Sequence, residues 1–468
     1  MGLVESDVVI IGGGITGLST AYYIQSRAKK GGIKISCTLI EGTENLGGKI
    51  QTEYNAGFTI EGGPDSLSSS KPWVFNLCQE LGISKDLLKM NSAKTYILVD
   101  RKLLEIPEGM FQVAPSRLIP FLKTGLLSPT GKIRALMDLL IPKSRDERDE
   151  SIASFIRRRL GKQVLLRIAA PLLAGVHGCS AQELSIDATF PYLKDIERRY
   201  RSLIFGLFKE KRKGKSKKGD QAFYTLKRGL REIIDAIVSN IDHDYTSIIT
   251  GKHVRSVSIN PYDKRFEVLL EDGSTLRGRS VVFATPAYIT ADILSLPELS
   301  MLKSIRYASV VVVTLAFRHE IKSVFAGTGF LIPSESELRI SACTITSNKW
   351  SGFSPPGYTL LRCYLDTNRE ASILDYSDKQ LAEIVLKDLK AVLSIAEEPL
   401  FIKVNRWKNA FPCYSIGHRE KIRALEEAIS LYPGLHIAGA SYHGISISDC
   451  IQQAESTAYK VLNFLNNK

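Results

Sequence analysis

The sequence predicts an α/β fold that contains a dinucleotide-binding domain, and three segments carry the prediction. Residues 7–41 read as a strand, a glycine turn, a helix and a second strand. Residues 252–286 read as short alternating strands around an Asp-Gly turn, followed by a buried strand. Residues 435–465 read as a strand, a glycine-containing loop and an amphipathic helix. The 468 residues leave room for a second domain between these segments.

The first of these segments contains the most specific motif. A strand over 7–11 runs into Gly12, Gly14 and Gly17, which form G-x-G-x-x-G at the start of a helix. Gly12 allows the tight turn, Gly14 lets the backbone approach a pyrophosphate, and Gly17 allows close packing of helix on strand. The helix N-terminus offers N–H groups to the phosphates. Glu41 ends the second strand, where a carboxylate can accept hydrogen bonds from ribose hydroxyls.

An acidic residue at this position favours an unphosphorylated ribose, and therefore FAD or NAD over NADP. The alternative is a glycine turn of purely structural origin. We expect cofactor contacts from Gly12, Gly13, Gly14, Ile15, Thr16, Gly17, Glu41 and Gly42.

The segment that follows Glu41 separates FAD from NAD. The chain reads EGTENLGGKI over 41–50 and YNAGFTIEGGPDS over 54–66. A glycine pair beyond the ribose acid, then Gly-Pro after a further strand, resembles the amine oxidase superfamily of flavoproteins, in which both segments run alongside the flavin. Two positions depart from that pattern, because Asn45 stands where Arg is usual and Gly62 where a basic residue is common. The resemblance implies a Rossmann-like FAD-binding domain, with contacts from Gly48, Lys49, Gly63, Pro64, Asp65 and Ser66.

The same resemblance gives roles to later residues. It implies that Val254 brackets the adenine through its backbone and that Trp407 packs beside the flavin, with an ordinary strand or core residue as the alternative at each position. Ser448 or Asp449 can cap the last helix, whose N-terminal dipole would face the flavin and stabilise negative charge on the reduced ring. Further cofactor contacts are expected from Gly439, Ser446, Ile447 and Ser448.

The FAD-binding domain is therefore expected to be discontinuous. Its ranges are 1–75, 220–290 and 400–468. The ranges 76–109 and 291–399 are expected to form an α+β substrate-binding domain, and 110–219 a helical, membrane-associating subdomain.

Several strings go beyond the superfamily and occur in one order over nearly the whole chain. They are GGKI (47–50), GPDS (63–66), APLLAGVHG (170–178), GTGFLIP (327–333), ACTITSNKW (342–350) and RW followed by P-x-Y-x-x-GH (406–418). The ordered set resembles the bacterial oxygen-dependent protoporphyrinogen oxidases, whose branch in Gram-positive-type bacteria acts mainly as coproporphyrinogen III oxidase. The resemblance implies an FAD-linked, six-electron oxidation of a porphyrinogen with release of hydrogen peroxide, in haem biosynthesis.

The resemblance also implies which residues meet the substrate. A porphyrinogen is a disc with propionate groups, which calls for a flat apolar slot with cationic rims. Lys71 matches a basic position of the bacterial family and is expected to contact a propionate, and Tyr364 matches an aromatic position of the pocket. A solvated lysine and a core tyrosine are the alternatives. His177 is also expected at the substrate, and it and Cys179 depart from the aromatic residue and glycine common in related sequences.

No catalytic side chain is predicted, because the flavin carries the chemistry and no Ser-His-Asp or paired-carboxylate set is required. The expected partners are the porphyrinogen, molecular oxygen and, transiently, a neighbouring enzyme of haem synthesis. Two other functions stay open. One is an amine oxidase or carotenoid-type desaturase on the same fold, and the other is a noncatalytic flavin-binding paralogue, suggested by Asn45, Gly62, His177 and Cys179.

Charge and apolar pattern bear on location. The net charge is +13, and residues 209–218 hold seven positive charges against one negative. A solvated loop is expected there, with attraction to an anionic membrane as the alternative, and nucleic acid is disfavoured because no binding motif accompanies the charges. No apolar stretch approaches the length of a membrane-spanning helix. We expect a cytoplasmic protein with peripheral contact on the inner face of the cell membrane, through the helices of 110–142.

The seven cysteines are widely spaced and include no C-x-x-C pair. They are predicted to be reduced and structural, and no metal site is expected. Cys413 lies near the position at which some amine oxidases attach flavin covalently. Noncovalent FAD is nevertheless expected, because the porphyrinogen branch holds its flavin that way.

Overall fold

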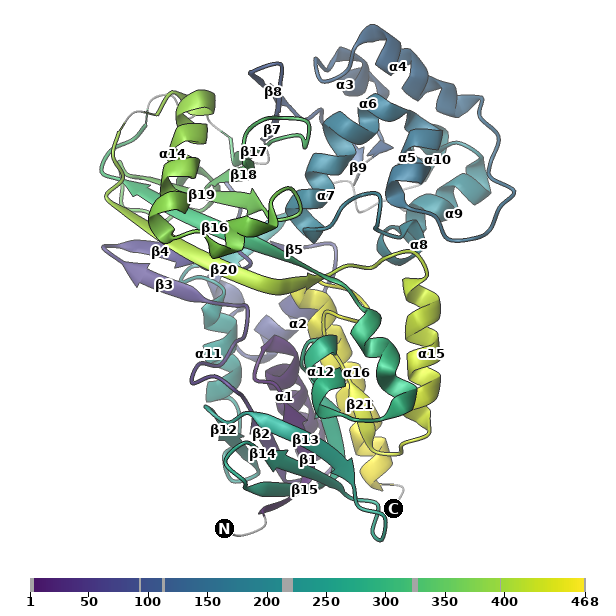
Figure 1. Ribbon diagram of the computed structural model, residues 1–468, viewed down its shortest axis with the longest axis vertical. Helices are drawn as coiled ribbons and strands as arrows, with labels where there is room; N and C mark the ends of the chain where they lie inside the picture. Colours follow the sequence, from purple (N-terminus) through teal and green to yellow (C-terminus); the bar gives the residue numbers. More distant parts are fainter. Residues whose placement is uncertain are drawn as a thin grey trace.

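The structure is a computed structural model that describes residues 4–91, 94–111, 114–212, 222–321, 327–395 and 397–466. It contains two large β-sheets, one toward each end of the long axis, and a group of helices beside the second sheet (Figure 1). The predicted α/β fold with an additional α+β region is confirmed.

The first sheet is mostly parallel and joins segments far apart in the sequence. Its strands run in the order β12-β2-β1-β15-β14-β13, and β21 also pairs with β15. Their bounds are β1 (Val4–Ile11), β2 (Cys37–Ile40), β12 (Thr246–Ile249), β13 (Val254–Ile259), β14 (Phe266–Leu270), β15 (Thr275–Phe283) and β21 (Leu435–Ile437). All four residues of β2 are buried, as expected of a parallel strand covered on both faces.

Helices from distant parts of the chain cover both faces of this sheet. They are α1 (Ile15–Lys30), α11 (Arg231–Ser239) and α16 (Ile447–Asn466) on one face, with α12 (Ala287–Ile293) and α15 (His418–Ser430) on the other. Leu18, Ile233 and Ile451 share one buried core with Val8 of β1. Because α1 follows directly on β1, its N-terminus lies at the carboxyl edge of the parallel strands, where ligands of such sheets bind.

The second sheet has the strand order β20-β16-β19-β18-β17-β7-β8. Its strands are β7 (Thr95–Val99), β8 (Lys102–Glu105), β16 (Tyr307–Phe317), β17 (Gly329–Leu331), β18 (Ile340–Ile345), β19 (Thr359–Asp366) and β20 (Phe401–Pro412). The helix α14 (Asp378–Leu393) covers one face, where it packs on Val313, Leu361 and Leu365. Because β20 pairs with β16, this sheet extends into the range 400–468 that the sequence assigned to the FAD-binding domain.

Residues 118–212 form the helical group (Figure 1). Its helices are α3 (Leu118–Lys123), α4 (Pro129–Leu136), α5 (Ile152–Leu160), α6 (Lys162–Val164), α7 (Ala170–His177), α8 (Ile186–Thr189), α9 (Pro191–Tyr200) and α10 (Leu203–Arg212), with a π-helical turn over Leu165–Ala169. They pack around Phe121, Phe155 and Leu193, as the apolar spacing predicts. The helix α7 contacts β17 and β18, so the group adjoins the second sheet.

Short elements connect these parts. They are α2 (Trp73–Glu80), α13 (Thr346–Lys349), β3 (Thr52–Asn55), β4 (Phe58–Glu61), β5 (Leu67–Ser68), β6 (Leu87–Lys89), β9 (Met110–Phe111), β10 (Ala114–Pro115) and β11 (Phe223–Leu226).

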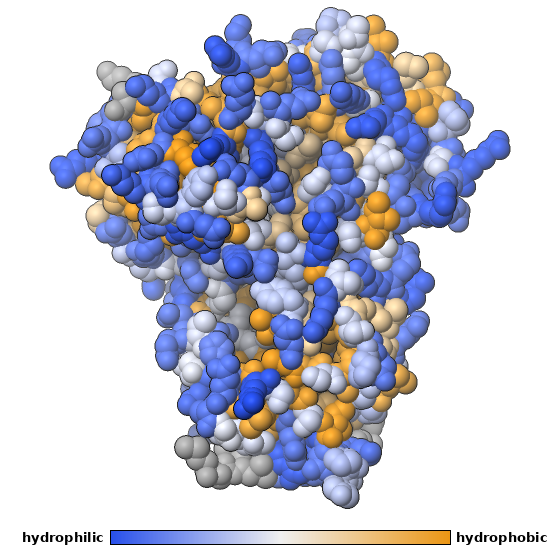
Figure 2. Space-filling model, viewed as in Figure 1, coloured by the Kyte–Doolittle hydropathy of each residue, from blue (hydrophilic) through white to orange (hydrophobic). Residues whose placement is uncertain are grey.

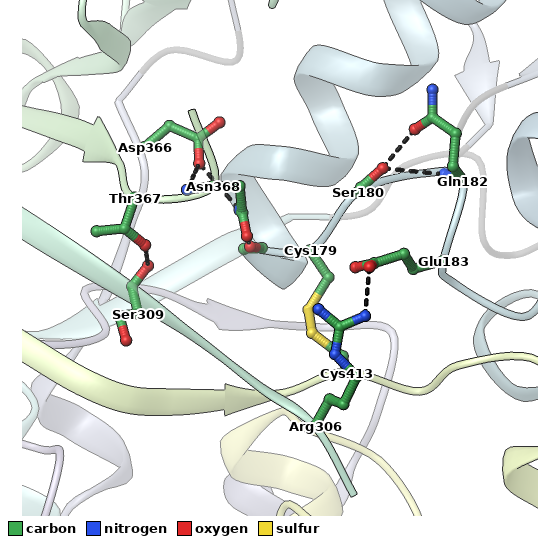
Figure 3. Close-up of a disulfide and its surroundings, with 11 residues drawn as sticks. Cys179, Ser180, Gln182, Glu183, Arg306, Ser309, Asp366, Thr367, Asn368 and Cys413 are labelled. Carbon is green, nitrogen blue, oxygen red and sulfur yellow. Dashed lines mark hydrogen bonds and ion pairs between the residues drawn. A yellow bond between two sulfur atoms is a disulfide. The ribbon is translucent and has the colours of Figure 1, made fainter. Parts of the chain in front are cut away.

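A disulfide joins the helical group to the end of β20 (Figure 3). Cys179, in the loop after α7, is bonded to Cys413, which directly follows β20, and both are buried. Arg306 lies beside the bond and pairs with Glu183 of the same loop (Figure 3). The prediction that all cysteines are reduced is therefore wrong for this pair, because folding brings together two residues 234 positions apart. The free cysteines are Cys37, Cys78, Cys343, Cys363 and Cys450.

Candidate cofactor and substrate site

The glycine turn after β1 is tight on its protein side and open at its tip. Gly12 has a φ of +108°, and its N–H donates to Ile40 O (2.8 Å). A methyl group at Gly17 would lie 1.9 Å from Gly12 O, whereas a methyl group at Gly14 would meet no protein atom within 4 Å. The turn therefore leaves space at Gly14 beside the N-terminus of α1, which fits a pyrophosphate held by backbone N–H groups.

The carboxylate of Glu41 lies at the edge of this turn. Its Oε2 accepts the N–H of Gly13 (2.7 Å). The start of β13 passes close by, because a methyl group at Gly42 would lie 2.8 Å from the ring of His253, which precedes Val254. The structure thus brings Glu41, Gly42 and the start of β13 together at the end of β2, where a carboxylate can accept hydrogen bonds from ribose hydroxyls.

The segment 47–50 lies against the turn, since the N–H of Gly47 donates to Gly13 O (2.8 Å). A methyl group at Gly48 would lie 3.3 Å from the Cα atom of Gly14. The side chain of Lys49 is exposed, yet enough protein surrounds it that burial lowers the pKa of its ammonium group.

The Gly-Pro segment lies on the other side of Lys49. A methyl group at Gly63 would lie 1.9 Å from Lys49 O and 3.6 Å from the ring of Trp407. The indole Nε1 of Trp407 donates to Gly62 O (2.7 Å). Together these segments form what we name the cofactor cradle: residues 12–17, 47–50, 62–66 and 446–448 with Trp407.

The N-terminus of α16 closes the cradle. A methyl group at Gly439 would lie 3.8 Å from Thr16 Oγ1 of α1. The N–H and hydroxyl of Ser446 donate to Asp449 Oδ2 (3.1 and 2.7 Å), and the N–H of Asp449 donates to Ser446 Oγ (3.2 Å). These bonds cap α16, so the predicted contacts Gly439, Ser446, Ile447 and Ser448 lie around a helix N-terminus that favours negative charge.

Lys71 is engaged at the same helix end. Its ammonium lies 2.5 and 2.6 Å from the two carboxylate oxygens of Asp449, whose side chain is 7% exposed. The pair ties the loop before α2 to α16 and neutralises the carboxylate. The contact between Lys71 and a propionate stays a prediction, and a propionate there would share the ammonium with Asp449.

One face of the second sheet turns toward the cradle and carries Tyr364. This tyrosine lies in β19 between Val312 of β16 and Ala342 of β18, and it is half-buried. Burial raises the pKa of its phenol. Arg362, two residues earlier on the same face, places its guanidinium 5.5 Å from the Tyr364 ring centre. The face therefore offers an aromatic ring between apolar neighbours.

A buried charge cluster that sequence reasoning missed lies where this face meets the cradle. Lys349 Nζ lies 2.9 and 3.1 Å from the carboxylate oxygens of Asp65 and donates to Ser66 Oγ (2.7 Å). Arg362 Nη1 lies 3.2 Å from Asp65 Oδ2. Burial alone would raise the pKa of Asp65, but Lys349 and Arg362 outweigh burial and hold this pKa well below its usual value. An arginine inside the apolar string TLLRCYLD was the available signal.

Tyr414 fixes the loop ahead of α16. Its hydroxyl donates to Ala440 O and accepts the N–H of Gly444, each at 2.7 Å. The ring of His418 stacks on Tyr414 with 4.0 Å between ring centres. Burial lowers the pKa of His418 to about 4, so this ring is neutral at pH 7. The string P-x-Y-x-x-GH therefore positions one wall of the cradle.

Three further predicted features differ in how far the structure describes them. His177 ends α7, but its side chain lies outside the described residues. Asn45 stands where related proteins usually have an arginine. Here Arg231 of α11 donates to Leu46 O (2.7 Å) and so brings a guanidinium to this segment. Across the described ranges, no three His, Cys, Asp or Glu side chains are grouped so that they could hold a metal ion.

The chain belongs to the flavin containing amine oxidoreductase family, whose model matches residues 15–462. The chain is 37% identical to the coproporphyrinogen III oxidase of Bacillus subtilis (strain 168), over 98% of this chain and 99% of that protein. It is 33% identical to the coproporphyrinogen III oxidase of Staphylococcus aureus, over 97% and 99% of the two chains. The family implies a flavin cofactor.

Solved structures agree with this fold. A crystal structure from Exiguobacterium sp. 255-15, provisionally named protoporphyrinogen oxidase, matches with a TM-score of 0.86 and 28% identity over 100% of both chains. A putrescine oxidase bound to putrescine matches with a TM-score of 0.68 at 13% identity, over 99% of this chain and 100% of that one, and at this identity it shows the fold alone.

Proposed function

We propose that the chain is an oxygen-dependent coproporphyrinogen III oxidase that produces coproporphyrin III and hydrogen peroxide in haem biosynthesis. The similarity to the Bacillus subtilis protein over 98% of this chain carries the proposal, because it spans the cradle and the sheet face together. Three bacterial relatives named coproporphyrinogen III oxidase are 30–37% identical, whereas plant protoporphyrinogen oxidases are 23–28% identical. This difference favours coproporphyrinogen III over protoporphyrinogen IX as substrate.

The proposed cofactor is noncovalent FAD. The open tip at Gly14 and the placement of Glu41 support a flavin that carries a pyrophosphate and a nucleoside. The sulfur of Cys413 is bonded to Cys179, which supports noncovalent binding because it leaves no thiol at that position. When bound, the flavin supplies the acceptance of hydride from a bridge carbon and the onward transfer of electrons to oxygen.

The chain's own residues would bind and orient the macrocycle. We assign the first sheet to FAD binding, the second sheet to substrate binding and residues 110–219 to a helical subdomain. Tyr364, with Val312 and Ala342 beside it, would lie under the flat face of the substrate. Lys71 and His177 keep their proposed places at the substrate rim.

The test is to load purified holoprotein anaerobically with coproporphyrinogen III or protoporphyrinogen IX and then to admit air. We expect flavin bleaching before air, then porphyrin fluorescence and peroxide that rise together at about three peroxides per porphyrin, since six electrons leave in pairs. A faster rate with coproporphyrinogen III supports the substrate assignment. A flavin that neither porphyrinogen bleaches would contradict the proposal and favour a noncatalytic paralogue.

We further propose that the helical group touches an anionic membrane surface. Ile119 of α3, Ile133 of α4 and Leu140 are 69%, 63% and 74% exposed. Figure 2 shows apolar surface at the upper right of the molecule, where Figure 1 places α3 and α4. Exposed Lys123 and Lys143 lie close in sequence to these residues, a combination that suits an interfacial contact. No described helix is long and apolar enough to cross a membrane, and most of the basic run 209–218 lies outside the described residues.

Flotation with vesicles rich in phosphatidylglycerol tests this contact. We expect the wild-type protein to float at low salt. The double variant Ile119→Glu, Leu140→Glu should bind roughly tenfold less, because two apolar side chains that would insert into the membrane surface become charged. Tyr262→Glu is the matched control, since Tyr262 is 94% exposed on the hairpin between β13 and β14. Absence of wild-type binding at low salt contradicts the contact.

A further inference from the structure

Arg362 is a buried arginine that reaches from the second sheet to the wall of the cofactor cradle. Its side chain is 1% exposed. Its Nη2 donates to Gly63 O (2.7 Å), and its Nη1 lies 3.2 Å from Asp65 Oδ2. Trp407, which lies in β20 of the same sheet, donates to Gly62 O (2.7 Å). Two side chains of the second sheet therefore hold two consecutive carbonyl groups of the cradle wall.

The hydrogen bonding of Arg362 is incomplete, unlike that of the fully buried Arg159. Its Nε is buried without a hydrogen-bond partner among the described residues, and its Nη1 is held only by the ion pair with Asp65 Oδ2 at 3.2 Å. Arg159, which is also fully buried, donates from all three nitrogens, to Asp138 and to four backbone carbonyl groups. A buried guanidinium with unused donors costs stability. Arg362 is therefore poorly explained as a purely structural tie.

The charges around Arg362 do not cancel. Asp65 is shared by two cations, Lys349 and Arg362, and both side chains are at least 87% buried. Glu61 is the next acidic group that influences Arg362, and burial raises its pKa to about 7, so it is only partly ionised at pH 7. The cluster consequently carries excess positive charge directly behind the Gly62–Asp65 backbone, in a region where little solvent screens it.

We propose that Arg362 is a positioning residue that fixes the Gly62–Asp65 wall of the cradle and, with Lys349, makes reduction of the bound flavin more favourable. The inference rests on the proposed function only in that a flavin occupies the cradle. A reduced flavin carries more negative charge than the oxidised one, so a fixed positive charge behind the wall favours the reduced state. The N-terminus of α16 acts in the same direction from another wall.

The test measures the midpoint potential of the flavin in holoprotein, without any porphyrinogen. Arg362→Met removes the charge, and we expect the equilibrium constant for two-electron reduction to fall roughly tenfold, a shift of about 30 mV to more negative potential. Lys349→Met should shift the potential in the same direction, because it removes the second cation and leaves Arg362 with Asp65. Arg362→Lys should restore most of the potential, since it retains the charge.

Arg369→Met is the matched control. Arg369 lies just after β19, is 21% exposed and pairs with Asp366, away from the cradle wall. We expect this variant to leave the potential unchanged. An unchanged potential in both Arg362→Met and Lys349→Met, with flavin fully bound, would overturn the inference. If Arg362→Met does not fold, Lys349→Met and Arg362→Lys still decide, because loss of one positive charge should shift the potential whereas exchange of one cation for another should not. Failure of the porphyrinogen assay leaves this measurement intact, so the two proposals can fail separately.

Discussion

Reducing the disulfide between Cys179 and Cys413 is expected to lower the free energy of unfolding by about 2–5 kcal/mol. The bond closes a loop of 234 residues, and a cross-link over a long loop removes much of the entropy of the unfolded chain. The entropy of unfolding of a chain this long is on the order of 1 kcal/mol per kelvin, so the midpoint should fall by roughly 2–5 °C.

Flavin retention should fall with stability in the same experiment. Cys413 directly precedes Tyr414, whose hydroxyl holds Ala440 and Gly444 in the loop ahead of α16. Releasing the sulfur loosens the anchor of that loop, because the end of β20 is then no longer tied to the helical group (Figure 3). We expect faster flavin release in dithiothreitol. The release can be measured as the rise of free flavin fluorescence after dilution.

The double variant Cys179→Ser, Cys413→Ser is the control for this prediction. It should unfold near the temperature of the reduced wild-type protein and should not respond to dithiothreitol. Cys78, which is buried and free in α2, offers a second comparison, since Cys78→Ser should leave the response to the reductant intact. A wild-type midpoint that is the same with and without dithiothreitol, while mass spectrometry shows the bond reduced, would contradict a stabilising role.

The features that the sequence predicted correctly are local in the chain. The opening strand, turn and helix follow from the spacing of Gly12, Gly14 and Gly17, because the whole motif lies within one short segment of the chain. The α/β class follows from hydrophobic periodicity, which each element displays by itself. The approach of Val254 to the Glu41 segment, by contrast, was available only through the resemblance to a known family.

The features that escaped prediction depend on contacts between distant segments. Cys179 and Cys413 carry no spacing signal, because only the approach of the helical group to β20 makes them neighbours. The pairing of Asp65 with Lys349 and Arg362 likewise joins the first quarter of the chain to its last third. The pairing of Lys71 with Asp449 spans 378 residues and likewise leaves no local trace. Such partners become visible only once the two sheets are placed together.

Gly63→Ala is expected to have the largest effect on the cofactor site. The added methyl group would lie 1.9 Å from Lys49 O, a backbone atom that cannot yield as a flexible side chain can. The wall 62–66 would have to move away from 47–50, and the bond from Trp407 to Gly62 O would be strained. We therefore expect flavin occupancy after purification to fall at least tenfold, measured by the ratio of flavin to protein absorbance, with a lower unfolding temperature of the apoprotein.

Two other glycines separate steric damage to the protein from loss of cofactor space. A methyl group at Gly14 meets no protein atom within 4 Å, so Gly14→Ala should leave apoprotein stability unchanged and still weaken flavin binding, because the methyl group takes the place of the pyrophosphate. A methyl group at Gly31 makes only ordinary contacts of 3.5 Å or more at the far end of α1, so Gly31→Ala should change neither property. If Gly63→Ala retained full flavin and Gly14→Ala did as well, the cradle would not be the flavin site. If Gly14→Ala lost flavin at unchanged stability, the phosphate end of the cofactor would be located at the tip of the turn.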